Sequence, residues 1–268
     1  MKKNIIIRTI TGIVYVSIVV SALLVHPLFF IILTSVFALT GMIEMQKLLK
    51  SGPIPQYWYA IVIIAFAGSL ISAYNTSDAG FSIALLVLML VIIQSGVLFF
   101  SKENDLKAFF NLNFSLIYII IPIYLLNQVH LKTFADGVPY VLITFVLIWV
   151  NDTFAYLTGI LIGKHKMIER ISPAKTWEGF FGGMIFSLIA AYFLHRYYGS
   201  MDLKNWLLLG ALISLSAVIG DLFESMLKRY AGVKDSGNVF PGHGGMLDRI
   251  DSLLMAGPVL FVYLIFIK

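Results

Sequence analysis

The sequence contains no cysteine, few charged residues and no long run in which polar and apolar residues alternate. The absence of cysteine excludes disulfides, thiolate metal sites and cysteine nucleophiles. Only 12% of the 268 residues are charged, whereas a soluble globular domain carries about 25%, so a soluble monomer is excluded. A transmembrane β-barrel is also excluded, because the apolar runs are continuous.

Hydrophobic residues make up 59% of the chain. They fall in blocks of about 20, the length of helix that crosses about 30 Å of hydrocarbon. The pattern therefore predicts an all-α, polytopic membrane protein with about nine transmembrane helices. The predicted spans are about 5–25, 27–49, 57–74, 81–100, 108–129, 138–162, 179–198, 205–227 and 251–267.

The lysines and arginines predict the orientation of these spans. If the N-terminus is cytoplasmic and each span changes sides, fifteen basic residues lie in the cytoplasm, and four (Lys132, Arg196, Lys204 and Lys268) lie outside. This split follows the positive-inside rule, so the formal charge of +5 reports orientation and indicates no nucleic-acid partner. We expect a multi-pass protein of the cell inner (plasma) membrane with a cytoplasmic N-terminus.

Two polar segments, 163–178 and 228–250, are too long and too rich in Gly, Lys, Asp and His to be simple connectors. Both are predicted on the cytoplasmic side. Residues 1–135 contain nothing comparable and are interpreted as a scaffold of transmembrane helices. Residues 136–268 are interpreted as the transmembrane catalytic region.

Carboxylates within the predicted spans are the first candidates for chemistry. Asp221, Ser225 and Lys228 share one face of a helix by their i, i+4, i+7 spacing. Asp221 and Asp152 are both predicted within the cytoplasmic half of the bilayer, where an ionisable residue is costly without a partner or a water-filled cavity. Carboxylates near basic residues favour a divalent cation and a phosphorylated substrate.

Each of these residues also has a structural interpretation. Asp248 and Asp251 lie where the last span begins, and acidic residues stabilise a helix N-terminus through its dipole. Lys228 and Arg229 could end a helix and extend their charges towards water. Asp221 has the weakest structural explanation.

Glycine-rich stretches supply the remaining candidates. In Pro-Gly-His-Gly-Gly (241–245), glycine would let backbone N–H groups approach a phosphate, and His243 would donate a hydrogen bond to it. The other polar segment contains Lys175, followed by Gly179, Gly182 and Gly183. Those three glycines are explained equally well by close helix packing.

Several familiar signatures are missing. Gly159-x-x-x-Gly163-Lys164 is one residue short of a P-loop, Asp136-Gly137 lacks the Ala-Arg of CDP-alcohol phosphotransferases, and neither HExxH nor GxSxG occurs. A transporter with a midplane ion site stays an alternative. It is disfavoured because the chain has no internal repeat and its polar residues gather in one half.

The two polar segments and the ends of the adjoining spans resemble those of a known family, the phosphatidate cytidylyltransferases (CDP-diacylglycerol synthases). The resemblance is specific over about 150–251 and includes Asp152-Thr153 and the segment 172–179. One departure is Ala174, where the family is expected to have lysine or another polar residue. The matching positions of the last segment are Gly220-Asp221, Ser225, Lys228-Arg229, Lys234-Asp235, Pro241, His243-Gly244-Gly245, Asp248-Arg249 and Asp251.

The resemblance implies that CTP and phosphatidate from the bilayer react to give CDP-diacylglycerol and pyrophosphate at a site that faces the cytoplasm. It further implies Mg²⁺, with a second cation left open, and a homodimer. A transferase acting on another lipid phosphate stays an alternative. The implied roles are metal ligation by Asp221 and Asp248, substrate binding by Asp152, Lys175, Gly244 and Gly245, and catalysis by Ser225, Lys228, Arg229, Lys234, Asp235, His243, Arg249 and Asp251.

Overall fold

The computed structural model describes residues 2–50, 106–134, 137–240, 242 and 244–267, with scattered positions between 62 and 95. The chain divides into two compact units. Unit 1 consists of Met1–Ala135 and Asp235–Arg249, and unit 2 consists of Asp136–Lys234 and Ile250–Lys268. Helix α10 (Leu247–Ile267) therefore begins in unit 1 and continues in unit 2.

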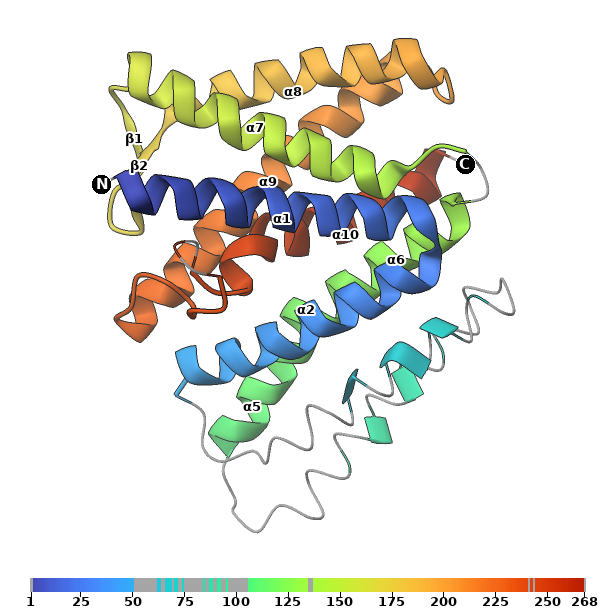
Figure 1. Ribbon diagram of the computed structural model, residues 1–268, viewed down its shortest axis with the longest axis vertical. Coiled ribbons are helices and arrows are strands. Elements are labelled where there is room, and N and C mark those ends of the chain that lie inside the picture. Colours follow the sequence, from blue (N-terminus) through green and yellow to red (C-terminus); the bar gives the residue numbers. More distant parts are fainter. Residues whose placement is uncertain are drawn as a thin grey trace. The chain divides into compact units, whose positions relative to one another are not determined.

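Unit 1 contains α1 (Lys2–Val25), α2 (Pro27–Leu48) and a third helix built from α5 (Leu106–Ser115), the π-helical turn η1 (Leu116–Ile120) and α6 (Ile121–Thr133). The chain turns sharply between α1 and α2 (Figure 1), where Pro27 opens the new helix and the His26 ring accepts a hydrogen bond from Leu28 N. Pro122 has no N–H to donate to the preceding turn, and the helix widens into η1 just before it.

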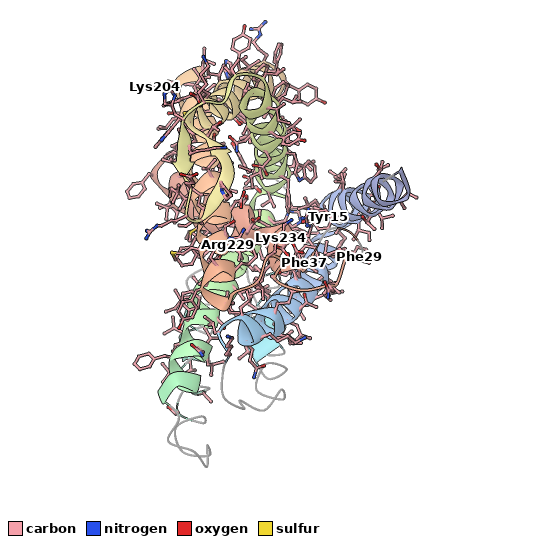
Figure 2. All side chains as sticks on the ribbon, turned by 90° about the vertical axis from the view of Figure 1, so that its left-hand side faces the viewer. Tyr15, Phe29, Phe37, Lys204, Arg229 and Lys234 are labelled. Carbon is pink, nitrogen blue, oxygen red and sulfur yellow. The ribbon has the colours of Figure 1, made fainter. Side chains whose placement is uncertain are left out.

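Aromatic contacts hold the 235–249 segment to the first two helices of unit 1. The Tyr15 ring stacks on Phe37 at 6.1 Å between centroids (Figure 2) and meets Phe240 edge-on at 6.0 Å. The Tyr15 hydroxyl also donates to the Arg249 carbonyl at 3.3 Å. Most of the second polar segment thus packs with N-terminal helices, which the sequence did not indicate.

Unit 2 contains α7 (Tyr140–Ile162), α8 (Trp177–Tyr198) and α9 (Leu203–Ala231), with α7 and α8 side by side (Figure 1). Glycines allow these helices to approach closely. A Cβ on Gly182 would overlap the Thr158 side chain, and one on Gly179 would lie 2.7 Å from the Ala155 carbonyl. The packing interpretation of these glycines therefore agrees with the structure.

Between α7 and α8 the chain forms a short antiparallel hairpin of β1 (Lys166–Ile168) and β2 (Ser172–Thr176). The Glu178 carboxylate closes its base by accepting hydrogen bonds from Lys164 N at 3.1 Å and His165 N at 3.2 Å. The all-α prediction did not include this hairpin. It was missed because its strands are short and depend on contacts outside their own sequence.

Six helices in the described part of the chain are long and apolar enough to cross a membrane: Pro27–Leu48, Phe110–Thr133, Tyr140–Ile162, Trp177–Tyr198, Leu203–Ala231 and Leu247–Ile267. The apolar part of α1, Thr9–Val25, is shorter. Apolar side chains such as Phe29, which is 55% exposed, project from these helices (Figure 2). The fold is therefore a polytopic helical membrane protein. The predicted spans 57–74 and 81–100 lie largely outside the described residues, so the count of nine and the orientation stay predictions.

Candidate functional site

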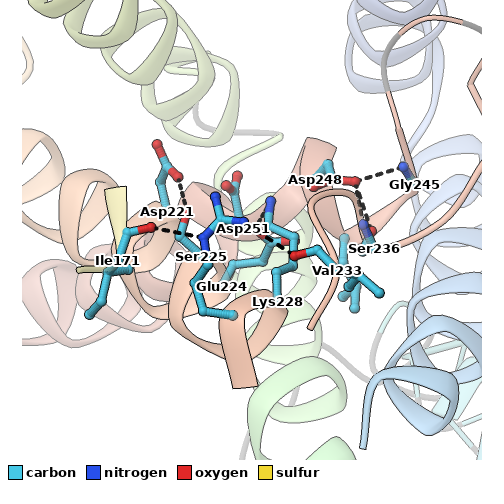
Figure 3. Close-up of polar contacts among 12 residues, drawn as sticks. Ile171, Asp221, Glu224, Ser225, Lys228, Val233, Ser236, Gly245, Asp248 and Asp251 are labelled. Carbon is cyan, nitrogen blue, oxygen red and sulfur yellow. Dashed lines mark hydrogen bonds and ion pairs between the residues drawn. The ribbon is translucent and has the colours of Figure 1, made fainter. Parts of the chain in front are cut away.

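In unit 2, candidate side chains gather near the C-terminal end of α9, which is predicted to lie on the cytoplasmic side (Figure 3). The Ser225 hydroxyl donates to Asp221 Oδ1 at 3.3 Å, in keeping with their i, i+4 spacing. Asp221 Oδ2 pairs with Lys175 Nζ of β2 at 2.6 Å. Both partners are partly open to solvent, with 37% of the Asp221 side chain and 24% of the Lys175 side chain exposed. A charged group in the surrounding solvent can therefore reach both Asp221 and Lys175.

Lys228 pairs with Glu224, one turn earlier on α9. The Glu224 side chain is fully buried and that of Lys228 is 12% exposed. A buried carboxylate needs a counter-charge, so loss of Lys228 would leave Glu224 with a large desolvation cost. This role differs from both interpretations of Lys228 drawn from the sequence, in which Lys228 either contacts a phosphate or ends the helix. Glu224 itself was not singled out, although its i, i+4 spacing to Lys228 was the available signal.

Arg229 ties the hairpin to the end of α9. Its Nε donates to the Ile171 carbonyl at 3.2 Å (Figure 3), and its Nη1 donates to the Val233 carbonyl at 3.3 Å. Ile171 lies between the two hairpin strands. Arg229 thus helps to hold the hairpin that presents Lys175.

Two further carboxylates complete the cluster in unit 2. Asp251 of α10 is half-buried, accepts a hydrogen bond from Ser252 N at 2.7 Å, and lies close enough to Asp221, Asp152 and Lys228 to interact with them electrostatically. Asp152 of α7 is exposed, and its Oδ1 accepts a hydrogen bond from Asn151 Nδ2 at 3.2 Å. We call Asp152, Asp221 and Asp251, with Lys175 and Lys228, the acidic cluster.

In unit 1, the segment 235–248, here called the glycine loop, is organised around Asp248. Asp248 Oδ2 accepts hydrogen bonds from Gly245 N at 2.7 Å and from both Ser236 N and Ser236 Oγ at 2.9 Å (Figure 3). Asp248 therefore does stabilise the start of α10, as its structural interpretation proposed. Ligation of a metal ion by Asp248 stays a prediction.

A second carboxylate, Glu44 of α2, reaches the same loop and was missed in the sequence. It is 4% exposed, and it accepts hydrogen bonds from Met246 N, Leu247 N and Ser236 Oγ, each at 2.9 Å. The available signal was a lone acidic residue inside an apolar span, which is costly unless a partner receives it.

Two glycines of the loop, Gly244 and Gly245, have structural reasons to be glycine. Gly244 has φ +82°, and a Cβ there would lie 2.5 Å from Asp248 Oδ2. A Cβ on Gly245 would overlap Ser236 Oγ and the Glu44 carboxylate, and the Gly245 N–H already donates to Asp248. In this structure the Gly245 N–H is directed at Asp248, and its contact with a phosphate stays a prediction. His243 lies outside the described residues.

The predicted site residues are divided between the two units. Asp235, Gly244, Gly245, Asp248 and Arg249 belong to unit 1, and Asp152, Lys175, Asp221, Ser225, Lys228, Arg229, Lys234 and Asp251 belong to unit 2. Lys234 and Asp235 are exposed, and Arg249 is half-buried. Of the two predicted metal ligands, Asp221 belongs to unit 2 and Asp248 belongs to unit 1. That they bind the same metal ion stays a prediction.

The carboxylate and hydroxyl oxygens in each unit are suited to a hard divalent cation that a substrate phosphate helps to hold. Within the described part of the chain, no group of three or more His, Asp or Glu side chains is arranged to hold a metal ion. Mg²⁺ does not require such a group, because it usually takes one or two carboxylates and completes its shell with water and substrate phosphates. The partly exposed Asp221, with the Ser225 hydroxyl beside it, fits that mode of binding.

Comparison with known proteins gives consistent results over the full chain. Residues 6–267 match the model of the cytidylyltransferase family. Similar proteins include the phosphatidate cytidylyltransferases of Staphylococcus aureus (strain COL), which is 33% identical, and of Staphylococcus haemolyticus (strain JCSC1435), which is 35% identical. Each alignment covers 97% of this chain and 98% of the relative.

Proposed function

This chain belongs to the cytidylyltransferase family, and from that premise we propose that it is a phosphatidate cytidylyltransferase, which converts CTP and phosphatidate into CDP-diacylglycerol and pyrophosphate. The observation that carries the proposal is the full-length match to relatives of that name. The acidic cluster supports it, because its lysines can contact anionic phosphates and its carboxylates can bind a divalent cation that neutralises them.

In the proposed reaction, a phosphatidate phosphate oxygen forms a bond to the α-phosphorus of CTP. The bond from that phosphorus to the β-phosphate oxygen breaks in line, and pyrophosphate leaves with the electron pair. A phosphate monoester has a second pKa of about 6 and is largely ionised at neutral pH, so no side chain is needed as a strong general base.

The chain's own residues would bind and neutralise the reacting phosphates. Asp221 and Asp248 would hold Mg²⁺, which when bound would neutralise charge on the phosphoryl oxygens. Lys175 would exchange its pairing with Asp221 for contact with the triphosphate, since both ends of that ion pair are partly exposed. Ser225 would orient Asp221 through their hydrogen bond.

The direct test is release of pyrophosphate by the purified, detergent-solubilised chain. We expect release that requires CTP, phosphatidate and Mg²⁺ together, and that stops when EDTA removes the metal. Diacylglycerol, which lacks the phosphate, is the matched control lipid. Equal release with diacylglycerol, or none with phosphatidate, would contradict the proposed reaction.

We further propose that the enzyme is a homodimer in the plasma membrane and that its site faces the cytoplasm. The apolar helices and the bacterial relatives support the membrane location, and the predicted split of basic residues supports the orientation. The homodimer rests on the family resemblance alone. A reporter fused after Lys50 should be cytoplasmic, and one fused after Lys268 should lie outside. Cytoplasmic signal from both fusions would contradict the nine-span arrangement.

A further inference from the structure

We propose that Glu44 is a positioning residue, which acts from α2 to hold the glycine loop and Asp248 in the conformation that the reaction needs. The inference rests on the proposed function for its kinetic test, and on contacts within unit 1 for its structural basis. No functional signature of the sequence includes Glu44.

Glu44 lies in an environment that is unfavourable for a charged group. It is a carboxylate on a helix that is apolar enough to span a membrane, and only 4% of it is exposed. Burying such a group is strongly unfavourable unless hydrogen bonds satisfy its oxygens. Oε1 accepts from Met246 N, and Oε2 accepts from Leu247 N and Ser236 Oγ. Both oxygens are therefore committed to the glycine loop.

Two of the donors to Glu44 are backbone amides at the start of a helix. Met246 and Leu247 lie at the N-terminal end of α10, where backbone N–H groups have no partner within the helix. Glu44 supplies the missing acceptors from 202 and 203 residues away in the chain. Its charge also lies at the positive end of the helix dipole. Glu44 is thus a helix cap contributed by a different helix.

The Ser236 hydroxyl connects Glu44 to Asp248. The Ser236 hydroxyl lies 2.9 Å from Glu44 Oε2 and 2.9 Å from Asp248 Oδ2. A serine hydroxyl has a single hydrogen and can donate to one acceptor at a time, so Ser236 couples the two carboxylates. Removing Glu44 would leave the two amides without their acceptor and the Ser236 hydroxyl with Asp248 alone, so the loop around Asp248 would lose one of the two carboxylates that fix it.

Gly237 and Gly245 show how closely the loop fits this carboxylate. A Cβ on either residue would overlap a Glu44 side-chain oxygen. Only glycine lets the loop pass so close to Glu44 at these two positions. Gly237→Ala should therefore displace the same carboxylate from the loop side, without changing Glu44 itself.

The experiment compares Glu44→Gln, Glu44→Ala and Gly237→Ala in the full-length chain. Ser35→Ala is the matched control, because Ser35 is a buried polar residue of α2 whose hydroxyl bonds to Ile31 O of the same helix. Two quantities are measured: hydrogen exchange of the peptide containing Met246 and Leu247, and the Mg²⁺ concentration that gives half-maximal pyrophosphate release.

We expect faster exchange of that peptide in all three variants and an unchanged rate in Ser35→Ala. The half-activating Mg²⁺ concentration should rise by about 10- to 100-fold in Glu44→Ala, the usual cost of losing a group that orients a metal ligand. Glu44→Gln keeps one acceptor oxygen, so its increase should be smaller, and saturating Mg²⁺ should restore most of its kcat.

Each other outcome counts against the inference. Faster exchange with unchanged Mg²⁺ dependence would make Glu44 a structural cap only, and unchanged exchange would remove even that role. If Glu44→Ala does not fold, Glu44→Gln decides, because it keeps the shape of the side chain. If the wild-type chain releases no pyrophosphate, the proposed function fails and the kinetic role of Glu44 fails with it. The exchange result then still decides whether Glu44 holds the loop.

Discussion

Two carboxylates, Asp221 of unit 2 and Glu44 of unit 1, are held in opposite ways. In unit 2, Asp221 is 37% exposed and its partners are the side chains of Lys175 and Ser225. In unit 1, Glu44 is almost fully buried and accepts hydrogen bonds from backbone N–H groups. Asp248 Oδ2 also accepts a hydrogen bond from a backbone N–H group. The partly exposed Lys175 side chain can give way to a substrate group, whereas the amide donors to Glu44 fix the backbone of the loop. This difference supports the proposals that Asp221 binds an exchangeable ligand and that Glu44 positions the glycine loop.

The largest expected effect tests the exchangeable carboxylate. Asp221→Ala should lower pyrophosphate release by more than about 100-fold, because charge stabilisation of the phosphoryl group is lost. The protein should stay folded, since Asp221 is partly exposed. Asp202→Ala is the control, because it removes an exposed carboxylate just before the same helix. Near-normal release by Asp221→Ala would remove this residue from the site.

Lys228 tests whether a charge pair in unit 2 serves the reaction or only the fold. Lys228→Arg keeps a positive charge for Glu224, so we expect normal membrane insertion. The planar guanidinium replaces a compact ammonium poorly at a phosphate, so activity should fall at least about tenfold if Lys228 contacts substrate. A double variant, Glu224→Leu with Lys228→Leu, removes both buried charges, and it should be more stable than Lys228→Leu alone but inactive. Full activity of Lys228→Arg would restrict Lys228 to the pairing role.

Gly244 tests whether the loop of unit 1 is as tightly specified as its contacts indicate. Gly244→Ala should cost about 1–2 kcal/mol for its positive φ, plus the displacement of Asp248, and should also lower activity. Gly199→Ala is the control, because Gly199 has φ +60° but open space where the Cβ would lie. Thermal unfolding and pyrophosphate release should separate them: both variants lose stability, and only Gly244→Ala loses activity. Equal activity in the two would mean that the loop tolerates the displacement.

The smallest effect on stability is expected at Lys175. A partly exposed ion pair contributes at most about 1 kcal/mol, so Lys175→Ala should unfold almost as the wild type does. The KM for CTP should nevertheless rise several-fold, and the difference from wild type should shrink at high salt, where exposed charges are screened. An unchanged KM would show that Lys175 serves the hairpin rather than the nucleotide.

The family could be predicted from the spacing of residues in the sequence, whereas the roles of the site residues stay predictions. The resemblance to phosphatidate cytidylyltransferases rested on positions between 150 and 251, and the full-length family match confirms it. Glu224 and Lys228 form an i, i+4 pair that could have been inferred but was not. The contacts of Lys175 with Asp221 and of Glu44 with the glycine loop join residues far apart in the chain, and no local pattern indicates them.

The sequence by itself determined the membrane-spanning helices, because within a bilayer each segment must satisfy its own backbone hydrogen bonds and present apolar side chains. It also determined the face shared by Asp221 and Ser225, because helical spacing is a local property. Only the tertiary structure decided where the buried acids bond. The partners of Glu44 are backbone amides, which every residue carries. The fold alone therefore selects which of them a carboxylate meets.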